Sequence, residues 1–281
     1  MPTASMSLGP WRHVAASVIG TSHERMGGVC QDSNACGVLP NLPDGDVLLA
    51  IVADGAGSAK QAEIGSALAC RCIRRSVASF LEESYLDQVT RRTVGKWVHA
   101  FQREIAAIAS DSGLRVRDYA CTLLAAMVGE TRAVFFQVGD GSIVAADAEE
   151  GTYGHIFWPE RGEYENATFF ATDRRFAANL QFASVRRNIV EVAMFSDGLQ
   201  RLALDFRKTM PHEPFFRGVF PAVRTMTAES TEQLNQALGS FLSSPRINAR
   251  TDDDKTLILA SRVVERKVLE TNAVSEYAHS K

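Results

Sequence analysis

Three strand-like apolar segments of this sequence each end at an aspartate that is followed by glycine. "IVADGAGSAK" ends its apolar run at Asp54, "AVFFQVGDGS" at Asp140 and "VAMFSDGLQ" at Asp197. Three consecutive aspartates, residues 252–254, also stand directly before the strand-like "KTLILA". A strand that ends in aspartate presents a carboxylate at the rim of a sheet, and several such strands can direct their carboxylates at one point. The pattern therefore favours a β-rich fold with an acidic site at one rim.

Clustered carboxylates are typical of sites for hard cations, because Mg²⁺ and Mn²⁺ take oxygen ligands and keep several waters. Asp32, in "GGVCQDSNA", is a further candidate. Glycine after aspartate lets the backbone approach an ion closely and can offer its carbonyl as a ligand. The alternative is that Asp-Gly is an ordinary turn signal, which is the better interpretation of a single pair. Three such strands and a triple aspartate favour a metal site.

Hydrophobic periodicity predicts strands over residues 13–20 and 46–53, followed by two long helices. The first helix is expected over residues 61–83. The second is indicated by an apolar stripe at helical spacing, made of Val94, Trp97, Val98, Phe101, Ile105 and Ile108. In that stripe the aromatic residues are better explained as core than as a ligand site.

The rest of the chain reads mainly as strands. "CTLLAAMVG", "RAVFFQVGD" and "GSIVAAD" are expected to be successive strands, and "ATFFAT" and "QFASVRR" are weaker candidates within residues 151–188. A strand over 189–195 and a helix opened by a capping box at Ser230 and Gln233 precede the final strand "TLILASRVV". Because strands and helices do not alternate strictly, we expect an α+β fold with strands packed on strands and helices outside.

Composition is that of an ordinary globular protein, with 46% apolar and 22% charged residues among 281. The net charge of −3 provides no electrostatic argument for nucleic acid or an anionic membrane as a partner. No apolar run approaches the roughly 18 residues that a membrane helix needs, and the first residues lack a secretory signal. Five cysteines without a C-x-x-C pair disfavour a disulfide framework or a structural zinc site. A cytoplasmic protein is therefore expected.

Other catalytic motifs are absent from the sequence. It contains no G-x-x-x-x-G-K-[ST] loop for nucleotide phosphates, no G-x-G-x-x-G fingerprint after a strand, no G-x-S-x-G elbow and no H-E-x-x-H pair. The carboxylates are left as the main candidate for chemistry.

The ordered motifs resemble the metal-dependent protein serine/threonine phosphatases of the protein phosphatase 2C family, especially its bacterial branch with a "DGAGSA" loop. They are "CQDSN", "VADGAGSAK", "CTLLAAMV", "FQVGDGSIVA", "MFSDGLQRL" and "DDDKTLILA". The resemblance covers about residues 13–262. It implies a four-layer αββα sandwich of two antiparallel sheets flanked by helices, formed by residues 13–264, with an extension over 1–12 and a charged tail over 265–281.

The resemblance also implies two or three Mn²⁺ or Mg²⁺ ions. Asp54 would bridge two of them, the carbonyl of Gly55 would bind one, and Asp197 and Asp253 would complete the first ion. A third, weaker ion would use Asp140 with Asp197. Asp253 is preferred to its neighbours because Asp254 matches the family's asparagine. Asp32 would hold metal-bound water, which makes Asp54, Asp197 and Asp32 the implied catalytic residues.

The implied activity is hydrolysis of phosphoserine or phosphothreonine in a protein by attack of a metal-bridging water, without a phosphoenzyme. The expected partner is a phosphoprotein, a serine/threonine kinase or its target. Two alternatives stay open: a pseudophosphatase that acts as a binding or regulatory module, and a phosphatase of small phosphorylated molecules.

Three departures from the family pattern bear on the activity. Gln31 replaces the metal-facing glutamate, which predicts weaker binding of the second metal. Gly27 replaces an arginine that grips the substrate phosphate, and Ala56 replaces a histidine that bacterial members also lack. The nearest substitutes for the phosphate grip are loop residues, for which a solvated surface role is the alternative: His23, Arg25 and Lys60.

Overall fold

The computed structural model describes residues 10–159 and 168–263, and two five-stranded antiparallel sheets form its centre. The first sheet has the order β1-β12-β9-β6-β7: Trp11–Val18, Lys255–Arg262, Ile189–Phe195, Ser142–Asp147 and Tyr153–Phe157. The second has the order β2-β3-β4-β5-β8: Ser33–Leu42, Gly45–Ala53, Leu123–Val128, Ala133–Val138 and Gln181–Val185. The pair β10 (Leu204–Asp205) and β11 (Met210–Pro211) lies apart from both.

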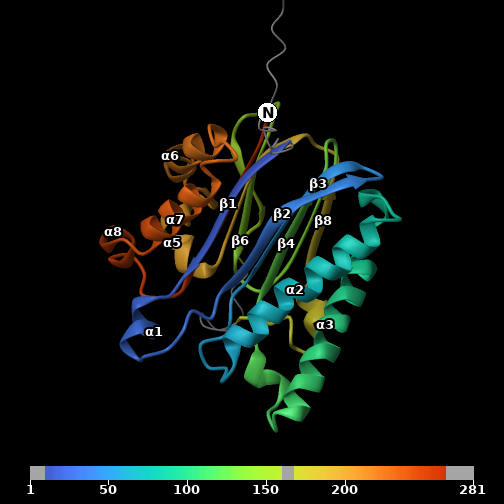
Figure 1. Cartoon of the computed structure of the whole chain (residues 1–281), viewed down its shortest axis with the longest axis vertical. Coiled ribbons are helices and arrows are strands. Elements are labelled where there is room, and N and C mark those ends of the chain that lie inside the picture. The colour runs from blue at the N-terminus through green and yellow to red at the C-terminus, as the bar shows by residue number, and fades with distance from the viewer. Residues whose placement is uncertain (1–9, 160–167, 264–281) are drawn as a thin grey trace, which may run out of the picture.

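Two long helices cover the outer face of the second sheet (Figure 1). They are α2 (Ala62–Leu81) and α3 (Arg91–Asp111). α3 begins after Thr90, whose side chain accepts a hydrogen bond from the backbone N–H of Thr93 and so caps one of the free donors of the first turn. Trp97 and Phe101 of α3 are buried in the core that these helices form with the sheet, as their spacing predicts.

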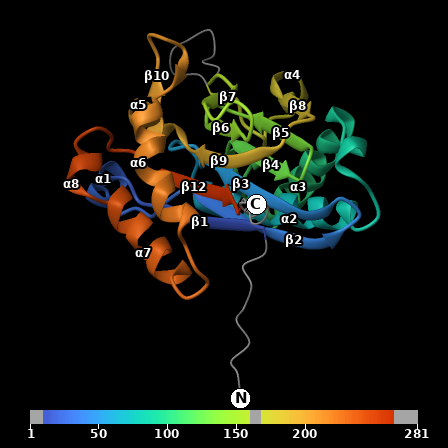
Figure 2. The ribbon, with the colours of Figure 1, turned by 90° about the horizontal axis from the view of Figure 1, so that it is seen from above.

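Shorter helices cover the outer face of the first sheet. They are α5 (Gln200–Ala203), α6 (Glu213–Arg224), α7 (Thr231–Leu242) and α8 (Pro245–Asn248). Seen from above, these helices and the pair α2 and α3 lie on opposite sides of the two sheets (Figure 2). The smaller elements α1 (Thr21–Arg25) and α4 (Phe176–Asn179), and the 3-10 turns η1 (Leu86–Gln88), η2 (Val116–Tyr119) and η3 (Asp197–Leu199), lie in the connections.

The two sheets pack on each other through apolar side chains, most of them aliphatic, with Trp11 and Phe135 as large aromatic members. Each strand contributes alternate residues to this inner layer, as the period of two requires. Alanines occur on both sheets there, including Ala50 and Ala126 on one and Ala145 and Ala260 on the other. The predicted four-layer sandwich of two antiparallel sheets flanked by helices is therefore confirmed.

Several local predictions were wrong or incomplete. Strand β2 was not predicted, because Asn, Gly and Pro punctuate it, and β7 and α6 were not predicted either. "ATFFAT" is not a strand over its described residues: the chain turns there, and Asp173 accepts a hydrogen bond of 3.0 Å from the N–H of Phe170. The predicted helix after Ser230 is correct but its capping box is not, since Ser230 Oγ accepts from the N–H of Thr227.

The chain ends stay outside this description. β1 begins at Trp11, and the predicted tail over 265–281 lies beyond the described residues. The domain boundaries at 13 and 264 stay predictions. All five cysteines are free thiols. Across the described ranges, none of the helices combines the length and the apolarity required to cross a bilayer.

Candidate functional site

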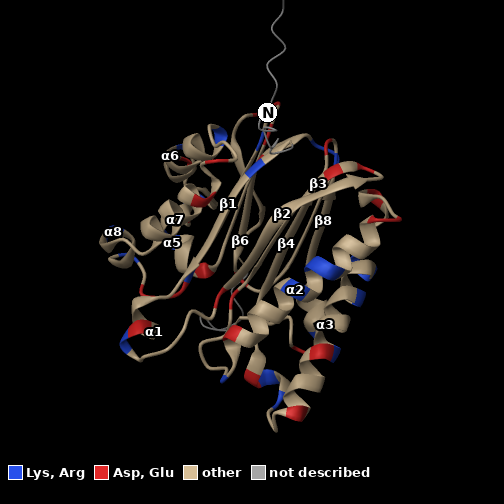
Figure 3. Cartoon of the chain, in the orientation of Figure 1, with Lys and Arg blue, Asp and Glu red and all other residues tan. Residues whose placement is uncertain are grey.

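The strand ends bring the predicted aspartates to one rim of the sandwich. In the first sheet Phe195 pairs with both Ser142 and Leu257, so the residues just beyond these positions lie at one edge: Asp140, Asp197 and Asp253. Asp54 follows β3 and so comes from the second sheet. Figure 3 shows acidic residues gathered at this end of the strands, between the two helical layers. The site therefore spans the seam between the two sheets.

Burial and mutual repulsion raise the pKa values of these carboxyls. The pKa of Asp54 lies well above its usual value, first because the group is buried and then because Asp32, Asp197, Asp253 and Asp140 surround it. Burial, with Asp140 and Asp253 nearby, raises the pKa of Asp197 to about 6. The pKa of Asp253 is raised in the same direction, mainly by burial. A cation among these groups would reverse the effect, because it stabilises the charged forms.

Three buried side-chain oxygens at this rim have no hydrogen-bond partner within the described part of the chain: Oδ1 of Asp197, Oδ1 of Asp32 and Oε1 of Gln31. Buried polar atoms are usually partnered, so unpartnered acceptors of this kind suit a hard cation and its waters. The donor set consists of oxygens, which fits Mg²⁺ or Mn²⁺. Within residues 10–159 and 168–263, no three His, Cys, Asp or Glu side chains are arranged closely enough to hold a metal ion as they stand.

Both carboxylate oxygens of Asp254 accept hydrogen bonds from distant backbone N–H groups, whereas Asp253 accepts one from its immediate neighbour. Its Oδ1 accepts a hydrogen bond of 2.6 Å from the N–H of Gly20, and its Oδ2 accepts one of 2.6 Å from the N–H of Gln31. Asp254 is 3% exposed, and its carboxylate is used in holding these loops. Asp253 lines an open cavity, and its Oδ1 accepts from the N–H of Asp254 at 2.8 Å. This difference supports Asp253 as the metal ligand of the triplet.

Close backbone approaches explain two glycines of the site. A Cβ on Gly55 would lie 2.7 Å from the carbonyl oxygen of Gln31 and 2.8 Å from Cβ of Ala62. A Cβ on Gly198 would lie 2.1 Å from the carbonyl oxygen of Asp254. Both positions therefore need glycine. Next to Gly55, the N–H of Asp54 donates to Oγ1 of Thr122 at 3.0 Å, which ties the end of β3 to the chain before β4.

Asp32 lies behind the cluster and is 6% exposed. Ser196 Oγ donates to Asp32 Oδ2 at 2.7 Å and accepts from the N–H of Thr256 at 3.0 Å, so the two sheets are linked at this point. Burial raises the pKa of Asp32 to about 7, against the lowering effect of its hydrogen bonds with Ser196 and Thr256. Its Oδ1 has no hydrogen-bond partner among the described residues.

The three candidates for a phosphate grip differ in their surroundings. His23 Nδ1 lies 3.0 Å from Asp254 Oδ1, so this ring is part of the loop that holds the triplet. Arg25 is exposed and pairs with Asp252 at 3.5 Å. Lys60 is exposed on the loop after Asp54. Gly27, which replaces the family arginine, has a φ of +68°, a conformation that an arginine would adopt only with strain.

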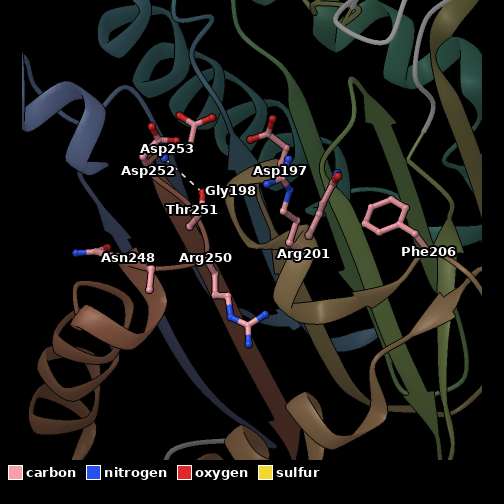
Figure 4. A pocket seen from close by; sticks show the side chains of 11 residues that line it. Asp197, Gly198, Arg201, Phe206, Asn248, Arg250, Thr251, Asp252 and Asp253 are labelled. Atoms are coloured by element: carbon pink, nitrogen blue, oxygen red, sulfur yellow. Dashed lines mark hydrogen bonds between the residues drawn. The ribbon is translucent and has the colours of Figure 1, made fainter.

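Sequence reasoning missed the basic residues that line the cavity at the site. A cavity of about 460 Å³ is bounded by Asp197 and Asp253 and also by Arg201, Arg250 and Phe206. In Figure 4, Arg201 lies beside Asp197, whereas the side chain of Arg250 extends away from Asp252 and Asp253. The sequence offered one signal for these arginines, which is that each stands close to a predicted site aspartate. Arg201 is in "SDGLQRL" with Asp197, and Arg250 is in "ARTDDD" with Asp253.

Lys255 was also missed. It is fully buried at the start of β12, and its Nζ donates to Oδ1 of Asn248 and to the carbonyl of Asp253, both at 3.1 Å. A buried ammonium needs partners of this kind. It places one positive charge under the triple aspartate.

Comparison with known proteins agrees with the fold and the motifs. The family model for protein phosphatase 2C matches residues 19–243. Serine/threonine-protein phosphatase 3 of Escherichia coli (strain K12) is 38% identical over 254 residues, which cover 89% of this chain and 98% of that protein.

Solved structures share the fold at low identity. The serine/threonine phosphatase Stp1 from Staphylococcus aureus has a TM-score of 0.52 and 16% identity, covering 93% of this chain and 99% of that one. RsbX in complex with magnesium has a TM-score of 0.53 and 12% identity, covering 92% and 98%. The resemblance predicted from the ordered motifs is thus confirmed, and the chain belongs to the protein phosphatase 2C family of serine/threonine protein phosphatases.

Proposed function

We propose that the acidic rim hydrolyses phosphoserine and phosphothreonine in a protein, with Mn²⁺ or Mg²⁺ as cofactor. The observation that carries this proposal is the convergence of Asp54 from one sheet with Asp140, Asp197 and Asp253 from the other. Burial and mutual repulsion raise the pKa values of these carboxyls, which costs stability when they are ionised, and a bound cation offsets that cost. The expected enzyme class, a phosphoprotein phosphatase, follows from the family of the chain.

In this proposal the site would hold two ions, with a third held more weakly. Asp54 and the carbonyl of Gly55 would provide ligands from the second sheet, and Asp197 and Asp253 would provide them from the first. Asp140 would serve the third ion with Asp197. When bound, Mn²⁺ or Mg²⁺ would lower the pKa of its bound water toward neutrality and would offset the charge of the phosphate dianion. That RsbX is described with magnesium is consistent with this choice of cation.

The side chains around the ligands have positioning roles in this proposal. Ser196 Oγ donates to one oxygen of Asp32, which orients the carboxyl and leaves its second oxygen free to accept a proton from water. Thr122 fixes the backbone of Asp54. Asp254 fixes the loops that carry Gly20 and Gln31, and so sets the position of its neighbour Asp253.

The substrate assignment is a phosphoprotein, either a serine/threonine kinase or its target, in the cytoplasm. The alternatives are a phosphatase of small phosphorylated molecules and a pseudophosphatase. Gln31 is the residue that favours the latter, because a neutral amide stands where the family has a charged ligand. The core aspartates are all present, which favours an enzyme.

The test is release of phosphate from p-nitrophenyl phosphate and from a phosphothreonine peptide, with Mn²⁺, with Mg²⁺ and with chelator. Wild type should turn over both compounds only with metal, and Asp197→Asn should lose at least about 100-fold in kcat, as expected when a charge-stabilising group is removed from the reacting centre. Asp87→Asn, an exposed change in η1, is the control. Tight metal binding without turnover of either compound would establish the pseudophosphatase.

A further inference from the structure

A second cavity adjoins the acidic one and has the opposite charge. It measures about 680 Å³, and it shares Arg201, Phe206 and Arg250 with the cavity at the aspartates. The polar lining that it does not share consists of Arg207, Arg246, His212 and Asp205. The two cavities therefore border each other, with aspartates lining one and four arginines lining the other.

The guanidinium groups of the second cavity are available to a ligand. The structure gives no hydrogen bond or ion pair from the side chains of Arg201, Arg207, Arg246 and Arg250 to any other described residue. The one carboxylate, Asp205, already accepts hydrogen bonds from the N–H groups of Arg207 and Lys208 at 3.1 and 3.3 Å, and Lys208 Nζ lies 3.8 Å from it. Four arginines with one engaged carboxylate leave an excess of positive charge.

The walls of this cavity are partly apolar, which indicates what kind of anion fits. Leu202, Leu204, Pro214 and Phe215 line it together with the arginines. Phe206 is 38% exposed at the boundary between the two cavities, and its ring packs edge-on against Trp158 at 5.5 Å between centroids. A peptide segment offers both apolar and charged groups to such walls, whereas a free inorganic anion offers charge alone.

We propose that this arginine cavity binds a second anionic group of the same substrate segment whose phosphoresidue occupies the aspartate cavity. The substrate class is a protein segment with a second phosphoserine or phosphothreonine, or with glutamates and aspartates, close to the phosphoresidue. Arginine recognises phosphate and carboxylate by paired, charge-assisted hydrogen bonds. The proposal rests on the phosphatase activity proposed above, and it assigns Arg207 and Arg246 to substrate selection.

The variant Arg207→Ala/Arg246→Ala tests this assignment, because both residues line the arginine cavity and neither lines the aspartate cavity. Arg92→Ala/Arg103→Ala is the matched control: it removes the same charge from exposed positions on α3, on the opposite helical layer. Substrates are phosphothreonine peptides that differ only in a second phosphoserine placed between two and five residues away. The rate on p-nitrophenyl phosphate, which has no peptide segment, measures hydrolysis separately from peptide binding.

We expect wild type and control to prefer a doubly phosphorylated peptide by about tenfold in kcat/KM, through KM, as charge-assisted hydrogen bonds would provide. The cavity variant should lose that preference and keep its rate on p-nitrophenyl phosphate. A wild type without preference for any spacing, or a variant that keeps the preference, would overturn the proposal.

Binding without turnover separates this proposal from the phosphatase activity. In chelator, fluorescence anisotropy of the labelled doubly phosphorylated peptide should show about tenfold weaker binding to the cavity variant than to the control. This binding measurement tests the arginine cavity even if the protein hydrolyses none of the substrates. Equal binding to the two variants would refute the site. Displacement of the peptide by an equal concentration of inorganic phosphate, or of a single-stranded oligonucleotide, would show a site for another anion and also refute it.

Discussion

Oδ2 of Asp254 accepts a hydrogen bond of 2.6 Å from the backbone N–H of Gln31, across a separation of 223 residues in the sequence. With Oδ1 bound to the N–H of Gly20, this carboxylate joins the start of β12 to the loops before and after α1. Asp254 thus has a structural role, although it is adjacent to Asp253, the proposed metal ligand.

Asp254→Ala should destabilise the protein by about 3 kcal/mol, because two buried N–H groups lose their acceptor. For a chain of this size, that corresponds to a fall in Tm of about 5–10 °C. Differential scanning calorimetry in chelator measures it. Asp252→Ala is the control, since the exposed pair with Arg25 should contribute little. Equal effects of the two changes would contradict the structural role.

Gly20→Ala should displace the triple aspartate. A Cβ at this position would lie 2.2 Å from the carbonyl carbon of Asp253, and backbone cannot yield as a flexible side chain does. We expect a loss of about 1–3 kcal/mol in unfolding free energy and weaker Mn²⁺ binding by calorimetric titration. Gly95→Ala on α3 meets no atom within 4 Å and should stabilise by about 0.5–1 kcal/mol. Unchanged metal affinity in Gly20→Ala would argue against a ligand in this triplet.

Gln31→Glu should strengthen binding of the second metal. Oε1 of Gln31 is buried without a partner in the described structure, so a carboxylate there would add charge next to the cation site. We expect about tenfold tighter binding of the weaker Mn²⁺ ion, by titration calorimetry, as ligand charge dictates. In chelator the same change should lower Tm, because it adds repulsion. Gln233→Glu, exposed on α7, should do neither.

Without metal, stability should decrease as the pH rises from 4 to 7. The pKa values of Asp197 and Asp32 are about 6 and about 7 in the folded chain, against 3.8 for an ordinary aspartate, so the folded protein binds more protons over this interval. The stabilisation is complete below the unfolded pKa and is lost as the pH passes the folded values. We expect Tm in chelator to fall by about 5 °C between pH 5 and pH 7.5.

Added Mn²⁺ should reverse that trend, because metal competes with protons for the same oxygens and binds better as the pH rises. Asp197→Asn should weaken the pH dependence in chelator, since it removes one of the raised groups. A Tm that rises between pH 5 and pH 7.5 in chelator would show that these carboxyls do not repel one another in the folded protein.

Elements with a strong periodic signal could be predicted from the sequence, and those governed by tertiary contacts could not. The predicted bounds of α2, β9 and β12 differ little from the observed ones, and the predicted apolar stripe from Val94 to Ile108 lies within α3. β2 contains Asn34, Gly37 and Pro40 and is a strand because β3 pairs with it along its length. "ATFFAT" has strand composition, but Gln102 of α3 donates to the carbonyl of Ala171 at 2.8 Å and holds this segment as a turn.

In the site, too, some residues could be predicted from sequence patterns and others depend on tertiary packing. The strand ends at Asp54 and Asp197 were visible as apolar runs that stop at Asp-Gly. Their convergence also required the two sheets to pack with these strand ends at the same rim, because β3 and β9 belong to different sheets. The arginines of the second cavity come from α5, from α8 and from the adjoining connections, and no spacing in the sequence relates Arg207 to Arg246. Their proximity is a property of how these segments pack on the first sheet.

Because Asp54 belongs to one sheet and Asp197 to the other, the inner layer between the sheets acts as the spacer of the catalytic rim. Alanines such as Ala50, Ala126, Ala145 and Ala260 set how closely the sheets approach. A bulkier residue there would push the two halves of the ligand set apart while leaving every ligand in place. We therefore expect the metal affinity of the proposed site to depend on side-chain volume in this buried layer, although none of its residues is a proposed ligand.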